Sequence, residues 1–145
     1  MLKLFKNSST LRLLALVYAV LFVVTGSLRH LPYINSPDGH TLGIFKLEWY
    51  DDLLHYGSGV WAVIAAWYSV KASINFFKIF GIIYGLDGVM GFFLGQGYLD
   101  LGIFLKGYTE LDWGFKFWAN IPHITIGATA VYIGYILSKK YPKNV

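Results

Sequence analysis

The sequence contains no cysteine, and this absence removes several kinds of chemistry. Disulfide bonds, cysteine-ligated zinc, iron–sulfur clusters and thiol catalysis are all excluded. Charged residues are also scarce, at 14% of the 145 residues, against about 25% in an ordinary soluble domain. The chain has no Gly-rich phosphate loop, no nucleophilic serine motif and no H-E-x-x-H motif. It therefore carries no catalytic constellation, and the sequence names no reaction.

Long apolar stretches are what the sequence does have, with 56% apolar and 19% aromatic residues. Four stretches come close to the ~20 residues that a helix needs to cross a bilayer. No small-residue cleavage site follows the first stretch, so we expect a membrane anchor rather than a removed signal peptide. The pattern predicts an all-α integral membrane four-helix bundle, in one domain covering 1–145. The predicted spans are 11–28, 53–70, 76–96 and 121–138.

The basic residues are unequally divided among the segments between these spans. The N-terminal arm, the turn after the second span and the C-terminal tail hold eight of the twelve Lys and Arg and no acidic residue. The two long loops hold seven of the eight acidic residues. The positive-inside rule then places both termini in the cytoplasm and the long loops outside the cell membrane. The basic surface suits anionic lipid headgroups rather than nucleic acid. Its eight residues are Lys3, Lys6, Arg12, Lys71, Lys78, Lys139, Lys140 and Lys143.

The second half of the chain repeats the first. One block recurs at an offset of 68 residues, at the start of the second and the fourth span. A block just upstream recurs at an offset of 59 residues. The division into two helical hairpins, about 1–72 and 73–145, follows from these matches. The paired blocks are Asp52-x-x-His55-x-x-x-Gly59 with Asn120-x-x-His123-x-x-x-Gly127, and Leu42-Gly43-Ile44-Phe45 with Leu101-Gly102-Ile103-Phe104.

The repeat has a geometric consequence for its two histidines. Each copy contains two spans, so both copies have the same orientation in the membrane, related by a pseudo-two-fold axis along the membrane normal. His55 and His123 are therefore predicted to lie at equal depth, at the outer ends of two parallel helices. On such an axis they can face each other across the centre of the bundle.

The twice-used Asn/Asp-x-x-His-x-x-x-Gly motif, with the Leu-Gly-Ile-Phe block before it, resembles a family of small four-helix bacterial and archaeal membrane proteins. That family is classified only as a domain of unknown function. The resemblance covers about 11–138. Asn120 fits the family pattern, whereas the first copy has Asp52 in place of Asn. The resemblance implies a membrane four-helix fold and no particular activity.

His55 and His123, each followed by a glycine one turn later, are the main candidates for a site. One interpretation is helix packing, with Gly59 and Gly127 allowing close approach and the histidines bonding across the contact. The other is a ligand site. Two axial histidines at one depth could hold haem b. The same pair could hold a zinc or copper ion with outer carboxylates such as Asp51, Asp52 or Asp112, or serve a proton-linked role.

Asp52 and Asn120 stand where the second and fourth spans begin. Both residue types are favoured helix N-caps, and Pro122 suits the first turn of a helix. We therefore interpret the two residues first as caps. Asp52 also lies three residues before His55, where a carboxylate could orient the imidazole.

Asp87 lies near the middle of the third span. An ionised carboxylate there costs at least ~2.5–3.5 kcal/mol, so it is a functional candidate. We expect it to be protonated or hydrogen-bonded inside the bundle, without a charged partner. A structural hydrogen bond is favoured over a role in transport. Glycines of the same span form a stripe on one face, which indicates packing within the chain or against another subunit. They are Gly81, Gly85, Gly88, Gly91 and Gly95.

Three classes of function follow. The first, which the lack of a catalytic constellation favours, is an interaction or accessory protein, either as a homo-oligomer or as a subunit of a larger membrane complex. The second is a cofactor-binding protein with a haem or a metal ion between His55 and His123. The third is a small transporter or channel that uses Asp87.

Overall fold

The computed structural model describes residues 5–141, and every regular element in this range is helical. The predicted all-α class is confirmed. Lys3 and Lys143, which belong to the predicted cytoplasmic charge, lie outside these residues. The α-helices are α1 (Phe5–Ser27), α2 (Trp49–Tyr68), α3 (Val70–Leu94), α4 (Gly102–Lys106) and α5 (Trp113–Tyr135), and short 3-10 helices cover Leu28–His30, Pro32–Ile34 and Leu137–Lys140.

Three helical segments of the described chain are long and apolar enough to cross a membrane. They are Thr10–His30, Val70–Leu94 and Trp113–Lys140, with mean hydropathies of 2.1, 1.6 and 1.3. This supports a membrane protein. The predicted second span is not among them, and its helix α2 begins with two aspartates and carries His55 and Ser58 among its buried residues. These polar groups lower the apolar content of α2.

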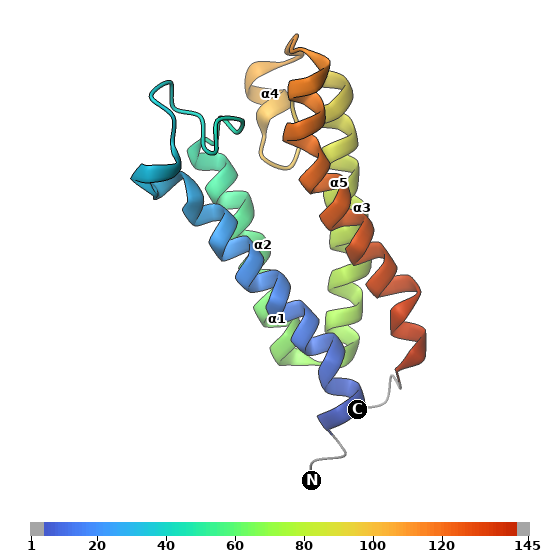
Figure 1. Ribbon diagram of the computed structural model, residues 1–145. Coiled ribbons are helices and arrows are strands. Elements are labelled where there is room, and N and C mark those ends of the chain that lie inside the picture. The colour runs from blue at the N-terminus through green and yellow to red at the C-terminus, as the bar shows by residue number, and fades with distance from the viewer. Residues whose placement is uncertain (1–4, 142–145) are drawn as a thin grey trace.

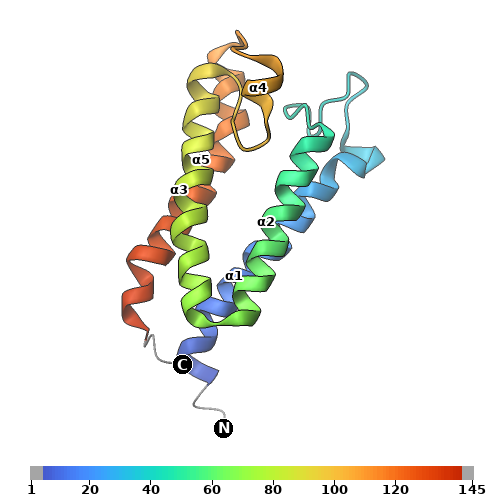
Figure 2. The ribbon, with the colours of Figure 1, turned by 180° about the vertical axis from the view of Figure 1, so that it is seen from behind.

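The long helices pack as two pairs, α1 with α2 and α3 with α5. Figures 1 and 2 show the pairs close together where α2 turns into α3 and leaning apart toward the opposite end, which we call the loop end. The turn is Ser69 alone, whose side chain accepts a hydrogen bond from the backbone N–H of Ala72 at 3.0 Å. The predicted turn at 71–75 is therefore wrong. Those residues continue the helix because the hydroxyl of Ser69 caps the first turn of α3.

An aromatic cluster joins the two pairs below the loop end. Phe22 of α1 contacts Phe80 and Tyr84 of α3, with ring centroids 5.1 and 5.5 Å apart. These three side chains are at most 1% exposed. The hydroxyl of Tyr18 crosses to the other pair and donates to the carbonyl of Ile126 at 2.9 Å. Edge-to-face aromatic contacts and this hydrogen bond hold the pairs together.

The glycine stripe of α3 faces α5. A Cβ atom at Gly81 would lie 2.6 Å from the backbone nitrogen of Val131, and one at Gly127 would lie 2.5 Å from the Cα of Gly85. Gly88 and Gly91 meet α5 in the same way, whereas Gly95 ends α3 with a φ of +79°. The interpretation as packing within the chain is confirmed, because the backbones approach too closely for side chains to fit.

The helix starts differ from the predicted caps. The N-cap of α2 is Glu48, whose backbone N–H donates to the side chain of Asp51 at 2.6 Å in a capping box. The N-cap of α5 is Asp112, whose side chain accepts the backbone N–H of Phe115 at 3.0 Å. Asp52 and Asn120 therefore lie inside helices and are not N-caps. Both helices start before the predicted spans, because an apolar stretch shows only which part of a helix suits a bilayer. The helical backbone hydrogen bonds extend beyond that part. Pro122 likewise lies within α5.

The backbone carries a trace of the repeat. Among residues 5–141, the non-glycine residues with a left-handed φ are Leu42 at 55° and Leu101 at 65°. Each begins one copy of the Leu-Gly-Ile-Phe block. Because this conformation costs an L-residue about 1–2 kcal/mol, its presence at matching positions supports a duplication.

Candidate functional site

A cavity of about 500 Å³ lies at the loop end, where the two helix pairs separate. Its walls come from α2, α3, α5 and both long loops, so neither hairpin forms it alone. The lining is unusually polar for such an apolar chain. Its charged, histidine and polar residues are His40, Lys46, Asp51, His55, Asp87, Gln96, Asp100, Lys106, Thr109, Asn120 and His123.

Asp87 and His123 form a hydrogen-bonded pair in this cavity. The Nδ1 atom of His123 lies 2.8 Å from Oδ2 of Asp87. The other oxygen of Asp87 accepts the backbone N–H groups of Tyr98 and Leu99 at 2.6 and 2.8 Å. The expectation that Asp87 is hydrogen-bonded inside the bundle is confirmed, and its partners are the histidine of α5 and the loop after α3.

This pairing fixes which ring nitrogen of His123 faces Asp87. An ionised Asp87 accepts the Nδ1 proton, and the Nε2 lone pair of the neutral ring is then available. Tyr84 stacks on the same ring, with centroids 4.4 Å apart. Asp87 and Tyr84 therefore hold the imidazole in one orientation. An oriented imidazole with a free lone pair can accept a hydrogen bond, take up a proton or bind a metal ion.

His55 lies opposite His123. Their ring centroids are 6.4 Å apart and the ring planes are inclined by 82°. His55 is only 4% exposed, and its Nδ1 has no hydrogen-bond partner in the described part of the chain. The structure therefore brings the two histidines together, although only one of them has a carboxyl partner.

The other sequence candidates have different roles. Asp52 accepts from Nε of Arg29 at 2.5 Å and lies 3.0 Å from Nε2 of His30, so it ties α2 to the segment after α1. It is not part of the cavity lining and does not orient His55. Asn120 lines the cavity and donates to the carbonyl of Lys116 at 2.9 Å.

The two motif glycines lie in helix contacts and are not part of the cavity lining. A Cβ atom at Gly59 would lie 3.3 Å from the carbonyl oxygen of Ala19 in α1. Gly127 contacts the stripe on α3, at Gly81 and Gly85. Each glycine therefore lets the helix that carries a site histidine approach the other helix of its own pair.

Carboxyl groups outnumber amines in the cavity lining, three to two. Burial and the neighbouring Asp100 raise the pKa of Asp51, two residues before the predicted second span, to about 7, although the backbone N–H of Glu48 opposes this shift. Of the two lining lysines, Lys106 lies 3.8 Å from Glu48 and Lys46 is exposed. The carboxyl groups of Asp51 and Asp100 are therefore left without a cation of their own.

No sequence pattern predicted three groups at this site, which are Asp100, Lys106 and the backbone N–H of Tyr98. Asp100 directly precedes the second Leu-Gly-Ile-Phe block, and this position next to a repeated element is the one signal that points to it. Nothing in the sequence shows that the loop after α3 folds back to Asp87. In the part of the chain that the structure describes, no group of three or more His, Asp or Glu residues is arranged to hold a metal ion.

No family model, curated protein or solved structure matches the chain. The resemblance to the family of small four-helix membrane proteins thus stays a prediction. What the cavity does has to be inferred from its own geometry and charge.

Proposed function

We propose that this chain is a small multi-pass membrane protein that binds a cationic group in the cavity between its two hairpins. In this proposal α1, α2, α3 and α5 span the cell membrane as a four-helix bundle, both termini are cytoplasmic, and the cavity opens to the outer side. The three strongly apolar helices support the membrane location. The distribution of basic residues supports the orientation.

The observation that carries the proposal is the oriented imidazole of His123, which faces His55 in a buried polar cavity. Buried ionisable groups are expensive in an apolar protein, and they persist where a function requires them. Packing alone does not require a histidine fixed by a carboxyl group opposite a second, unpaired histidine. The glycine face, which could have supported an accessory role through a subunit contact, is covered by α5.

The chemical groups that line the cavity indicate what kind of ligand it binds. Nε2 of His123 and the carboxyl oxygens of Asp100 can accept hydrogen bonds, Asp51 does so when it is ionised, and the lining holds more carboxyl groups than amines. A ligand that donates hydrogen bonds and carries positive charge complements such a surface. An ammonium group has both properties.

A transition-metal ion is the second candidate. Two imidazoles that share one ion place their ring centroids roughly 5–6 Å apart, because each metal–nitrogen bond is about 2.0–2.1 Å long. The observed 6.4 Å is close to this range. Asp51 or Asp100 would have to move to complete the ligand set. A haem is less well supported, because the polar lining does not match the apolar faces of a macrocycle.

The proposal can be tested with protein that carries ¹⁵N-labelled histidine, reconstituted in phosphatidylcholine nanodiscs. Methylammonium chloride and zinc chloride are the two probes, and the ring nitrogen signals are the readout. We expect methylammonium to shift the signals of His55 and His123 saturably and to leave His30, which is bonded to Asp52, unchanged. Asp87→Asn should weaken the effect at His123.

The two probes separate the two candidates. Saturable shifts with zinc and none with methylammonium would favour the metal ion over the ammonium group. The absence of a saturable shift at either cavity histidine with both probes would overturn the proposed binding function.

A further inference from the structure

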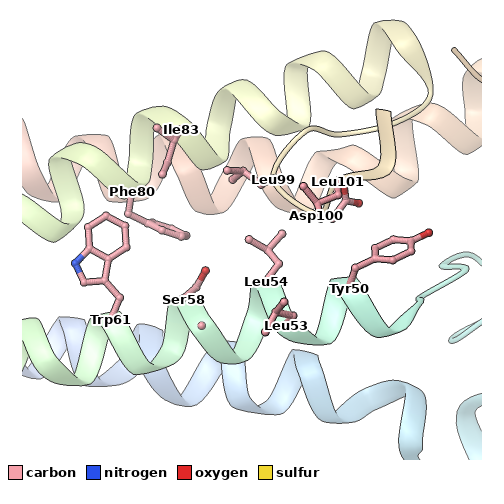
Figure 3. Close-up of a pocket in the computed structure, with 11 residues that line it drawn as sticks. Tyr50, Leu53, Leu54, Ser58, Trp61, Phe80, Ile83, Leu99, Asp100 and Leu101 are labelled. Carbon is pink, nitrogen blue, oxygen red and sulfur yellow. The ribbon is translucent and has the colours of Figure 1, made fainter. Parts of the chain in front are cut away.

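A second, apolar cavity of about 330 Å³ lies between α2 and α3, and we call it the groove. Figure 3 shows Trp61, Ser58 and Leu54 of α2 pointing across it, toward α3 and the loop that carries Leu99. Apart from its loop end, the one polar side chain in the lining is Ser58. The groove therefore suits a hydrocarbon.

The groove adjoins the polar cavity at one end. Tyr50 and Asp100 line both spaces. Figure 3 places these two residues at the loop end of the groove and Trp61 and Phe80 at the other end. Tyr50 is 8% exposed, and its hydroxyl has no hydrogen-bond partner in residues 5–141. The junction between the two spaces thus holds a carboxyl group and an unpaired hydroxyl.

The groove also reaches the molecular surface. Leu53 and Leu101 in its lining are 64% and 45% exposed, so the groove opens beside α2, where the proposed bilayer would lie. From Tyr50 to Trp61 it follows α2 for roughly 16 Å, at 1.5 Å per residue. Gly57 in its wall leaves open space, since a Cβ atom there would meet nothing within 4 Å.

We propose that the ligand is a single-chain amphiphile with an amine head, whose hydrocarbon chain occupies the groove and whose ammonium group enters the cavity beside Asp100 and Asp51. This inference rests on the proposed binding of a cationic group. The apolar lining favours a hydrocarbon chain in the groove. Because the groove is continuous with the carboxyl-rich cavity, the ammonium group of the same ligand can reach Asp100. A fatty acid of the same length would bring its negative charge against Asp100.

Three probes in the same nanodiscs test this inference: methylammonium, dodecylamine and dodecanoate, each read by the ring nitrogen signals of His55 and His123. The test variant is Gly57→Leu, which fills the groove without removing a polar group. Val60→Leu on the exposed face of α2 is the matched control. We expect Gly57→Leu to weaken the binding of dodecylamine by ~10-fold or more, because several methylene groups of the ligand are no longer buried. The binding of methylammonium should be unchanged. Val60→Leu should change neither.

Ile83→Phe, which fills the groove from α3, serves as a second variant and should act in the same way. Unchanged methylammonium binding shows that either variant is folded. If both variants bind dodecylamine like the wild type, the groove does not hold the chain, although the binding function stands. If dodecanoate binds as tightly as dodecylamine, the assignment of an amine head is wrong. If no amine shifts the wild-type signals, the cavity does not bind an ammonium group, and both this inference and the preferred ligand of the proposed function fail.

Discussion

The two hairpins carry the same histidine motif and use it differently. In the second hairpin, His123 is bonded to Asp87 of the preceding helix and stacked on Tyr84. In the first hairpin, His55 has no carboxyl partner, and the nearby Asp52 turns away to Arg29 and His30. The repeated motif thus supplies two imidazoles, and the helices packed beside them orient one and leave the other without a carboxyl partner.

The helix contacts differ in the same direction. Gly127 and the glycine stripe bring α3 and α5 into backbone contact, whereas Gly59 meets α1 less closely, with 3.3 Å from a Cβ atom there to the carbonyl oxygen of Ala19. The second hairpin therefore forms the rigid wall of the cavity, with Asp87 and His123 built into it. Four changes test this contrast, and they follow in order of expected effect.

Asp87→Leu should destabilise the protein most, by about 3 kcal/mol or more. It leaves the backbone N–H groups of Tyr98 and Leu99 and the ring of His123 without their acceptor. Asp87→Asn should cost only about 1 kcal/mol, because its amide oxygen can still accept both N–H groups. The free energy of unfolding in mixed detergent micelles measures both. Equal losses for the two variants would show that Asp87 serves no such bonding role.

Gly127→Ala should destabilise the protein by about 2–3 kcal/mol, because the added methyl group meets the backbone of Gly85 and overpacks the contact. Gly59→Ala is the matched change in the first hairpin, and its nearest neighbour, at 3.3 Å, can yield by a small shift. It should cost less than about 1 kcal/mol. The same unfolding experiment compares the two, and a larger loss for Gly59→Ala would reverse the assignment of the rigid hairpin.

Asp51 should give the stability a pH dependence. In the unfolded chain its pKa returns to about 4, whereas burial raises it to about 7 in the folded protein. Between these values the folded protein holds a proton that the unfolded chain has lost. The free energy of unfolding should therefore fall as the pH rises from 4 to 7.

Asp51→Asn should flatten this slope, and Asp112→Asn, at an exposed N-cap, should leave it intact. Thermal unfolding across the pH range, with each variant compared to the wild type, measures the difference. A slope that survives Asp51→Asn would assign it to another group.

Asp52→Asn should have the smallest effect, below about 1 kcal/mol, because the amide oxygen of asparagine can still accept the hydrogen bond from the half-buried Arg29. It should leave the ring nitrogen signals of His55 unchanged, whereas Asp87→Asn should shift those of His123. A shift at His55 in the Asp52→Asn variant would contradict the separation of Asp52 from the site.

Much of the architecture can be predicted from the sequence, because it depends on periodic patterns of residue types. The apolar stretches locate the long helices, the glycine spacing indicates close packing of one face of α3, and the offset of 68 residues predicts equal depth for His55 and His123, where they can face each other. Boundaries were less predictable. The turn at Ser69 and the starts of α2 and α5 depend on individual side-chain hydrogen bonds, which leave no periodic trace.

The sequence alone determined the helical class, which follows from the apolar stretches. It also determined the pairing of His55 with His123, which follows from the repeated motif. The partners of these histidines were decided in three dimensions. Asp87 reaches His123 because α3 and α5 touch through glycine, and the loop after α3 folds back to bond it. Such contacts join residues far apart in the sequence, and the polar cavity and the groove beside it exist only because the two hairpins separate at the loop end.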